Sequence, residues 1–258
     1  MKFGPVSLKD AQGAILAHSA QLPGGAIKKG RRLTRADIER LEQAGMSEIV
    51  AAVLESDDIP EDVAATRIAE RIAGPDVRCA EAFTGRVNLF AERDGIAVID
   101  TATLTMLNRI DEGLTVATLP AFERVTAGRM IATVKIIPFA LDSAVVSRAE
   151  QLIAEAAAPP LSVSAFAPRT AYLILTELTG SKPSVMEKRR QAIAKRLEAA
   201  GSTLVGSTTV PHQADAVAAA IREASWTPAD LLLVFGASAI VDRKDVIPAA
   251  IEAAGGTV

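Results

Sequence analysis

The hydrophobic positions divide the 258-residue chain into three stretches with different patterns. The clearest rhythm lies in residues 169–258, where continuous apolar runs alternate with segments whose apolar residues recur at helical spacing. Strand and helix repeated in this order require right-handed crossovers and produce a parallel sheet with helices on its faces. The pattern predicts strands near residues 171–177, 203–210 and 230–236, and helices over 184–201, 214–224 and 245–256.

The first two stretches are built from shorter elements. Residues 1–75 predict short strands and two helices, the first with Thr34 as its N-cap and Asp37 three residues later. Residues 76–168 predict half-buried strands and two further helices, a mixed α+β region. The pair Pro159-Pro160 and the loose segment "SVSAFAPRT" after it indicate a domain boundary before residue 169.

Composition supports helices laid on buried strands. Hydrophobic residues make up 49% of the chain but aromatic residues only 3%, so the cores must consist of Ala, Val, Ile and Leu. These residues suit an α/β protein better than a sandwich with aromatic layers. We therefore expect a three-layer, parallel-sheet α/β domain preceded by two smaller mixed α+β regions.

Charge and cysteine content exclude several classes of function. With 28 basic and 31 acidic residues, the net charge of −3 gives no general attraction to nucleic acid or to an anionic membrane. The single cysteine, Cys79, cannot form an internal disulfide, which favours a reduced setting. The N-terminus lacks the apolar core of a signal peptide, and no apolar run reaches the roughly 18–20 residues of a membrane span. A cytoplasmic protein is expected.

Candidate chemistry lies in two loops of the last stretch. In parallel sheets, ligands bind just beyond the carboxyl ends of the strands. The segment "LTGSKPS" lacks the first glycine of a P-loop, and neither a G-x-G-x-x-G nor a G-x-S-x-G sequence follows any predicted strand. The first loop could still form an anion pocket, or its residues could simply start the next helix. Its candidate residues are Thr179, Gly180, Ser181 and Lys182.

The second loop, residues 236–245, joins small residues to a cluster of charges. Small side chains allow backbone N–H groups to approach a ligand closely, and the following helix adds a positive dipole end. These small residues are Gly236, Ala237, Ser238 and Ala239.

The charged half of this loop has two interpretations. Arg243 and Lys244 would suit phosphate oxygens, and Asp242 and Asp245 could hold Mg²⁺ beside a phosphate. Alternatively, Asp245 caps the following helix and the other three residues form a solvated turn. The residues alone leave both interpretations open.

These segments resemble the molybdopterin-binding domain shared by molybdopterin adenylyltransferase, molybdopterin molybdenumtransferase and gephyrin. The segment "VFGASAIVDRKDVIPAAI" is similar to the family's glycine-containing strand end and the acidic helix start after it, and "TTVPHQADAVAAAIREA" is similar to the segment before it. Near the N-terminus, "PVSLKDAQGAILAHS" and "IKKGRRLTRADIERLEQAGMSEIVAAV" resemble the lead-in of the molybdenumtransferase type. Such a region precedes a nucleotidyltransferase domain in some bacterial proteins.

The chain also departs from this family. Phe235 replaces the first family glycine, and the spacing from Gly236 to Asp245 is about two residues longer. His212 stands where family members carry an acid after "V-P". The chain stops at Val258, where a further strand would begin in the family fold, so the domain over residues 169–258 is expected to be truncated.

The resemblance implies a role in molybdenum cofactor biosynthesis or maturation. The protein would bind molybdopterin or molybdenum cofactor and present it to a nucleotidyltransferase domain or partner, and a homo-oligomer is expected. As an alternative, it would be an active adenylyltransferase or molybdenumtransferase, with Asp245 and Asp242 as catalytic and metal-holding residues. A second alternative is an unrelated parallel-sheet domain without a pterin role.

Overall fold

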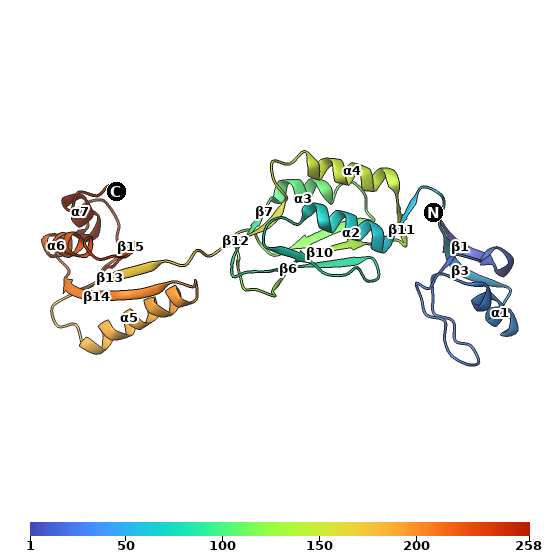
Figure 1. Ribbon diagram of the computed structural model, residues 1–258, viewed down its shortest axis with the longest axis horizontal. Helices are drawn as coiled ribbons and strands as arrows, with labels where there is room; N and C mark the ends of the chain where they lie inside the picture. The colour runs from blue at the N-terminus through green and yellow to red at the C-terminus, as the bar shows by residue number, and fades with distance from the viewer. The chain divides into compact units, whose positions relative to one another are not determined.

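The computed structural model describes residues 1–258 as a mixed α/β protein with two compact units, Met1–Ala165 and Phe166–Val258. The second unit begins three residues before the predicted position 169. Figure 1 shows the helices and strands of each unit. The strands named in the first unit pair only in antiparallel fashion, and the parallel strand pairs lie in the second unit.

The N-terminal part of the first unit is a three-stranded antiparallel sheet in the order β1-β3-β2. Its core is made mainly of aliphatic side chains such as Leu16, Leu33 and Leu41. The predicted capping box is confirmed, because the Thr34 side chain accepts from the Asp37 N–H and the Asp37 side chain accepts from the Thr34 N–H. The elements are β1 (Lys2–Ser7), η1 (Leu8–Asp10), β2 (Ile15–Leu16), α1 (Arg35–Gln43) and β3 (Glu48–Val53).

The remainder of the first unit surrounds one larger core. Helix α2 buries Ile68 and Ile72 among strand residues such as Leu89 and Val134. The predicted boundary at residue 75 therefore separates this helix from the sheet with which it shares a core. The elements are β4 (Asp58–Pro60), α2 (Glu61–Ile72), β5 (Val77–Cys79), β6 (Arg86–Ala91), β7 (Gly95–Ile99), α3 (Thr101–Leu107), β8 (Leu114–Thr118), β9 (Arg124–Val125), β10 (Met130–Ile136), β11 (Ala140–Asp142), α4 (Ser143–Ala154) and β12 (Leu161–Ala165).

Three antiparallel sheets lie in this part of the chain, with strand orders β5-β6-β10-β8, β11-β4 and β12-β7-β9. The segment expected to be a loose linker after Pro160 instead begins with β12, which pairs with β7. Its alternating Leu161 and Val163 side chains are buried in the core, whereas the serines between them are not.

The second unit contains the parallel strands expected from the sequence. Strand β13 lies between β14 and β15 and is parallel to both. Helix α5 and the pair α6 and α7 lie on opposite sides of this small sheet (Figure 1). The elements are β13 (Thr170–Glu177), α5 (Pro183–Glu198), β14 (Thr203–Pro211), α6 (Ala214–Ala224), β15 (Leu231–Phe235) and α7 (Val246–Ala253).

The core of the second unit is concentrated on the side of α6 and α7. Buried Val217, Ala218, Ile247 and Ala250 join these two helices, and Ile174 of the central strand packs against α6. Helix α5 contributes only Met186 as a buried residue. None of the helices in the structure combines the length and the apolar character that a bilayer crossing requires.

Candidate anion-binding site

The three parallel strands bring their carboxyl ends to one edge of the sheet. Strand β13 ends at Glu177, β14 at Pro211 and β15 at Phe235, and each is followed by a helix. Residues that lie far apart in the sequence therefore meet at this edge. It is also the edge at which parallel sheets bind ligands.

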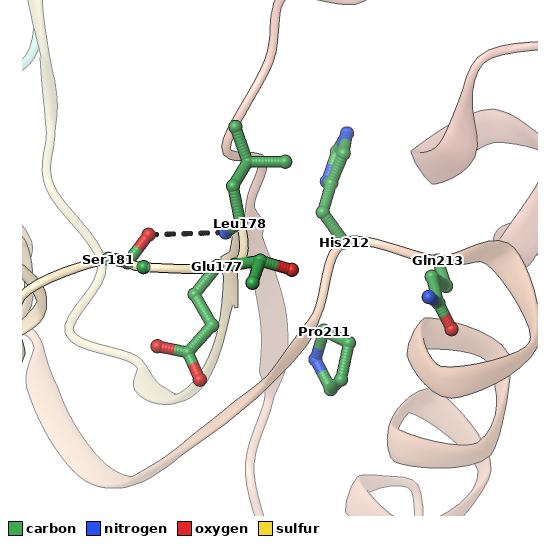
Figure 2. A pocket seen from close by; sticks show the side chains of 8 residues that line it. Glu177, Leu178, Ser181, Pro211, His212 and Gln213 are labelled. Carbon is green, nitrogen blue, oxygen red and sulfur yellow. Dashed lines mark hydrogen bonds between the residues drawn. The ribbon is translucent and has the colours of Figure 1, made fainter.

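A cavity of about 270 Å³ opens at this edge (Figure 2). It lies between the loop after β13 and the short connection from β14 to α6. Predicted residues Thr179, Gly180 and Ser181 line it, but Lys182 does not. The remaining lining residues are Glu177, Leu178, Pro211, His212 and Gln213.

The loop after β13 is a tight turn whose serine binds its own backbone. The Ser181 N–H donates to the Leu178 carbonyl oxygen at 3.0 Å, and the Leu178 N–H donates to Ser181 Oγ at 3.2 Å. Gly180 has a φ of 88°, a conformation that glycine adopts without steric cost. The N–H groups of Thr179 and Gly180 have no acceptor within the chain, so they are free to bind an anion.

The helices that follow the three strands start without side-chain caps. Lys182, Gln213 and Asp245 are the N-cap residues of α5, α6 and α7, and none of their side chains accepts a hydrogen bond from the helix it precedes. Glu187, in the first turn of α5, accepts hydrogen bonds from the Arg190 guanidinium. Uncapped helix N-termini carry unpaired N–H groups and partial positive charge, which favour anions.

The buried hydroxyl of Thr176 joins the three strand ends. Thr176 lies near the end of β13 and has no exposed surface. Its Oγ1 accepts the Ala237 N–H at 2.7 Å and shares a 2.9 Å hydrogen bond with His212 Nδ1. It also lies 3.4 Å from the Phe235 carbonyl oxygen. Thr176 therefore ties the first residues after β14 and β15 to the central strand.

The loop after β15 is organised by the carboxylates that were predicted to hold a metal. Asp245 Oδ2 accepts the N–H groups of Val241 and Asp242, the latter at 2.9 Å. These two hydrogen bonds lower the pKa of Asp245, and the charge of His212 adds to this lowering. Asp242 Oδ1 accepts the Lys244 N–H at 2.6 Å. Both carboxylates therefore bind the backbone of their own loop.

The other predicted residues of this loop lie at the same sheet edge but do not line the cavity. Gly236 is half-buried, and a Cβ atom there would come within 3.1 Å of the Ser238 carbonyl oxygen. Arg243 forms an ion pair with Glu252 of α7 at 3.3 Å, and the Lys244 side chain is exposed. Of the two candidate loops, only the loop after β13 borders the cavity.

Thr176, His212 and Gln213 contribute to the site but were not among the predicted site residues. Gln213 lines the cavity at the start of α6, and Thr176 positions His212, which the sequence marked only as a departure from the family acid. The signal for His212 and Gln213 was their position after a predicted parallel strand. Nothing in the pattern distinguishes Thr176 from its apolar neighbours except its hydroxyl.

In residues 1–258, no three His, Cys, Asp or Glu side chains gather into a group that could hold a metal ion. A family model described as a domain of unknown function (DUF8806) matches residues 5–60. Those residues belong to the first unit and include none of the candidate site. No curated protein matches the chain.

Replacing Thr176 by valine should release both neighbouring strand ends. The substitution keeps the side-chain shape but leaves the Ala237 N–H and His212 Nδ1 without their partner. An unsatisfied buried polar group costs about 1–3 kcal/mol, so the Tm should fall. Hydrogen exchange of the Ala237 amide should accelerate in Thr176→Val. Thr176→Ser is the matched control, because it keeps the hydroxyl and should keep the protection. Equal exchange in all three proteins would contradict this role.

Replacing Asp245 by asparagine should loosen the loop after β15 in a pH-dependent way. The pKa of Asp245 is lowered in the folded protein, so its stabilising effect is complete at neutral pH and is lost as the pH falls through that lowered value. The Tm of Asp245→Asn should therefore lie below that of the wild type at pH 7, and the difference should shrink in acid. Glu198→Gln, on the exposed surface of α5, is the control and should show no such difference. A constant difference at every pH would exclude the charge of Asp245 as the cause.

Proposed function

We propose that the unit Phe166–Val258 binds molybdopterin or molybdenum cofactor through its phosphate and holds it for a nucleotidyltransferase domain or partner. The observation that carries this proposal is the cavity at the carboxyl edge of the parallel sheet. Free N–H groups of Thr179 and Gly180 and the uncapped start of α6 meet there. Together these groups offer an anion the backbone donors and the positive dipole that phosphate sites use. The pterin itself is suggested by the sequence resemblance.

The size of the cavity suits the phosphate end of such a ligand. Pockets that enclose a whole small molecule have volumes of roughly 300–1,000 Å³. At about 270 Å³, this cavity is slightly too small for a pterin with its phosphate tail. A phosphate inside the cavity would leave the ring system outside it, accessible to another protein or domain.

The charged side chains favour binding over transfer. His212 and Glu177 both line the cavity, and Figure 2 shows their side chains pointing in opposite directions. Asp242 and Asp245 accept hydrogen bonds from the loop backbone, and using them to hold Mg²⁺ would require these bonds to break. A holding role needs no such rearrangement, and we therefore prefer it to adenylyl or molybdenum transfer.

The N-cap position of α6 provides a direct test. Asp and Asn are both good N-cap residues, so Gln213→Asp and Gln213→Asn should each maintain or raise the Tm. Only Gln213→Asp adds a negative charge to the cavity wall. Calorimetric titration of the full chain with molybdopterin should give an affinity at least about tenfold weaker for Gln213→Asp, which corresponds to roughly 1.4 kcal/mol. Gln213→Asn caps α6 without adding charge, so it should weaken binding less than Gln213→Asp. Failure of the wild type to bind, or equal affinities of the two variants, would contradict the proposal.

A further inference from the structure

A second cavity lies in the other unit, Met1–Ala165, and has no part in the function proposed above. Its volume of about 700 Å³ is sufficient to enclose a small organic molecule. One wall comes from β1 and the turn before residue 31, and the other from the end of β10 and the segment after it. The lining residues are Met1, Phe3, Lys29, Gly30, Glu61, Thr84, Lys135, Ile136, Ile137, Pro138 and Phe139.

Two lysines, Lys29 and Lys135, lie on opposite walls of this cleft. Neither Lys29 nor Lys135 forms an ion pair within the chain. Lys135 also lies directly opposite Arg86 in the pairing of β10 with β6, and like charges at such positions repel. An anion bound beside Lys135 would offset this repulsion.

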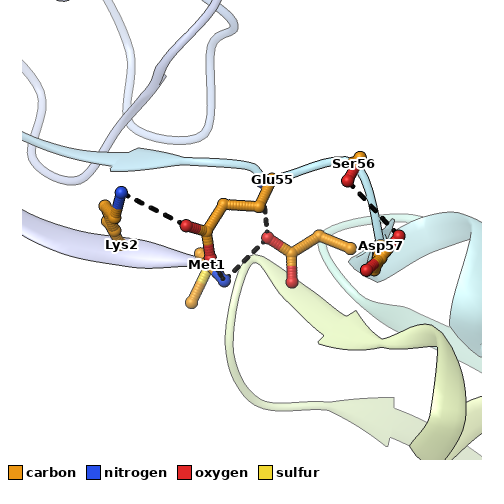
Figure 3. A network of polar contacts seen from close by, with 6 residues as sticks. Met1, Lys2, Glu55, Ser56 and Asp57 are labelled. Atoms are coloured by element: carbon orange, nitrogen blue, oxygen red, sulfur yellow. Dashed lines mark hydrogen bonds and ion pairs between the residues drawn. The ribbon is translucent and has the colours of Figure 1, made fainter.

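The third cation of the cleft, the N-terminal ammonium group, is already neutralised (Figure 3). The Met1 ammonium lies 3.0 Å from Glu55 Oε2 and 2.8 Å from Asp58 Oδ2. Lys2 lies 3.3 Å from the other oxygen of Glu55. These acids are therefore engaged at the N-terminus, and the two lysines remain as the cations available to a ligand.

The cleft also presents flat aromatic surface. The rings of Phe3 and Phe139 are stacked with their centroids 6.3 Å apart, and Phe3 is 60% exposed. Lys29 Nζ lies 5.8 Å from the centroid of the Phe139 ring, so a cation and an aromatic face are adjacent. Lys29 is positioned by a turn: its N–H donates to Ser19 Oγ at 2.9 Å, and Gly30 follows with a φ of 83°.

Glu61 is the acid within the cleft and opposes an anionic ligand. Burial raises the pKa of its carboxyl group, and the neighbouring Asp62 raises it further, whereas Lys29 lowers it. Its backbone N–H donates to the Phe139 carbonyl oxygen at 3.0 Å, which fixes the start of α2 beside the aromatic wall. A variant that removes the charge of Glu61 should therefore strengthen binding of an anion.

From this arrangement we infer that the cleft binds a small planar aromatic anion. Its acidic group pairs with Lys29 and Lys135, and its ring lies against Phe139. Neither the charge nor the ring alone would use both features of the cleft, so a ligand that carries both should bind more tightly than a ligand with either one.

The inference can be tested on the full chain with 1-naphthyl phosphate as the probe. Inorganic phosphate supplies the charge without the ring, and 1-naphthol supplies the ring without the charge. Fluorescence and calorimetric titration should show tighter binding of 1-naphthyl phosphate than of either comparator. Lys29→Gln and Lys135→Gln should each weaken it by roughly tenfold, the loss expected for one charge-assisted hydrogen bond. Phe139→Leu should weaken it as well, and Glu61→Gln should strengthen it.

Lys9→Gln is the matched control, because Lys9 is exposed and does not line the cleft. The affinity of the Lys9→Gln variant for the probe should equal that of the wild type. Thermal unfolding should show that each variant is folded. Unchanged binding in the double variant Lys29→Gln/Lys135→Gln would overturn the inference, as would binding of 1-naphthol as tight as that of 1-naphthyl phosphate. Because Gln213 lies in the other unit, Gln213→Asp should not alter probe binding at the cleft, which separates failure of this inference from failure of the proposed function.

Discussion

The hydroxyl of Thr176 is the interaction on which the candidate site depends. It is buried at the end of the central strand and is the hydrogen-bonding partner of both Ala237 and His212. Parallel pairing alone brings three chain segments to one edge, but it does not fix the residues that leave the sheet. The Thr176 hydroxyl fixes them through its hydrogen bonds to His212 after β14 and to Ala237 after β15. The cavity wall that contains His212 is therefore coupled to the start of the loop after β15.

The sequence predicted the second unit better than the first for a physical reason. In "AYLILTEL" and "ADLLLVFG" the strands are continuous apolar runs, which are readily recognised. The central strand β13 is buried on both faces, whereas β15 at the edge is only partly buried. In the first unit, β12 was mistaken for a linker, since its serines alternate with only two or three apolar residues and its partner β7 lies more than 60 positions earlier. Pairing over that separation leaves no local signal. For the same reason, the sequence did not indicate that α2 shares a core with the sheet β5-β6-β10-β8.

The candidate site was predicted in part. Position after a parallel strand identified Thr179, Gly180 and Ser181, and all three line the cavity. The charges of the second loop suggested phosphate and metal binding, yet Asp245 binds N–H groups of its own loop and Arg243 pairs with Glu252. Short polar side chains often bind nearby backbone in this way, and residue type alone does not distinguish that role from ligand binding. The cavity instead uses His212 and Gln213, whose importance depends on the strand order.

We propose that the phosphate of a pterin ligand binds between the loop after β13 and the start of α6. Amide chemical shifts of the ¹⁵N-labelled full chain, recorded during titration with molybdopterin, test this claim most directly. The largest shifts should occur at Thr179, Gly180 and Gln213, and the amides of Arg243 and Lys244 should change little. Shifts centred on residues 236–245, or no shifts anywhere in the second unit, would contradict it.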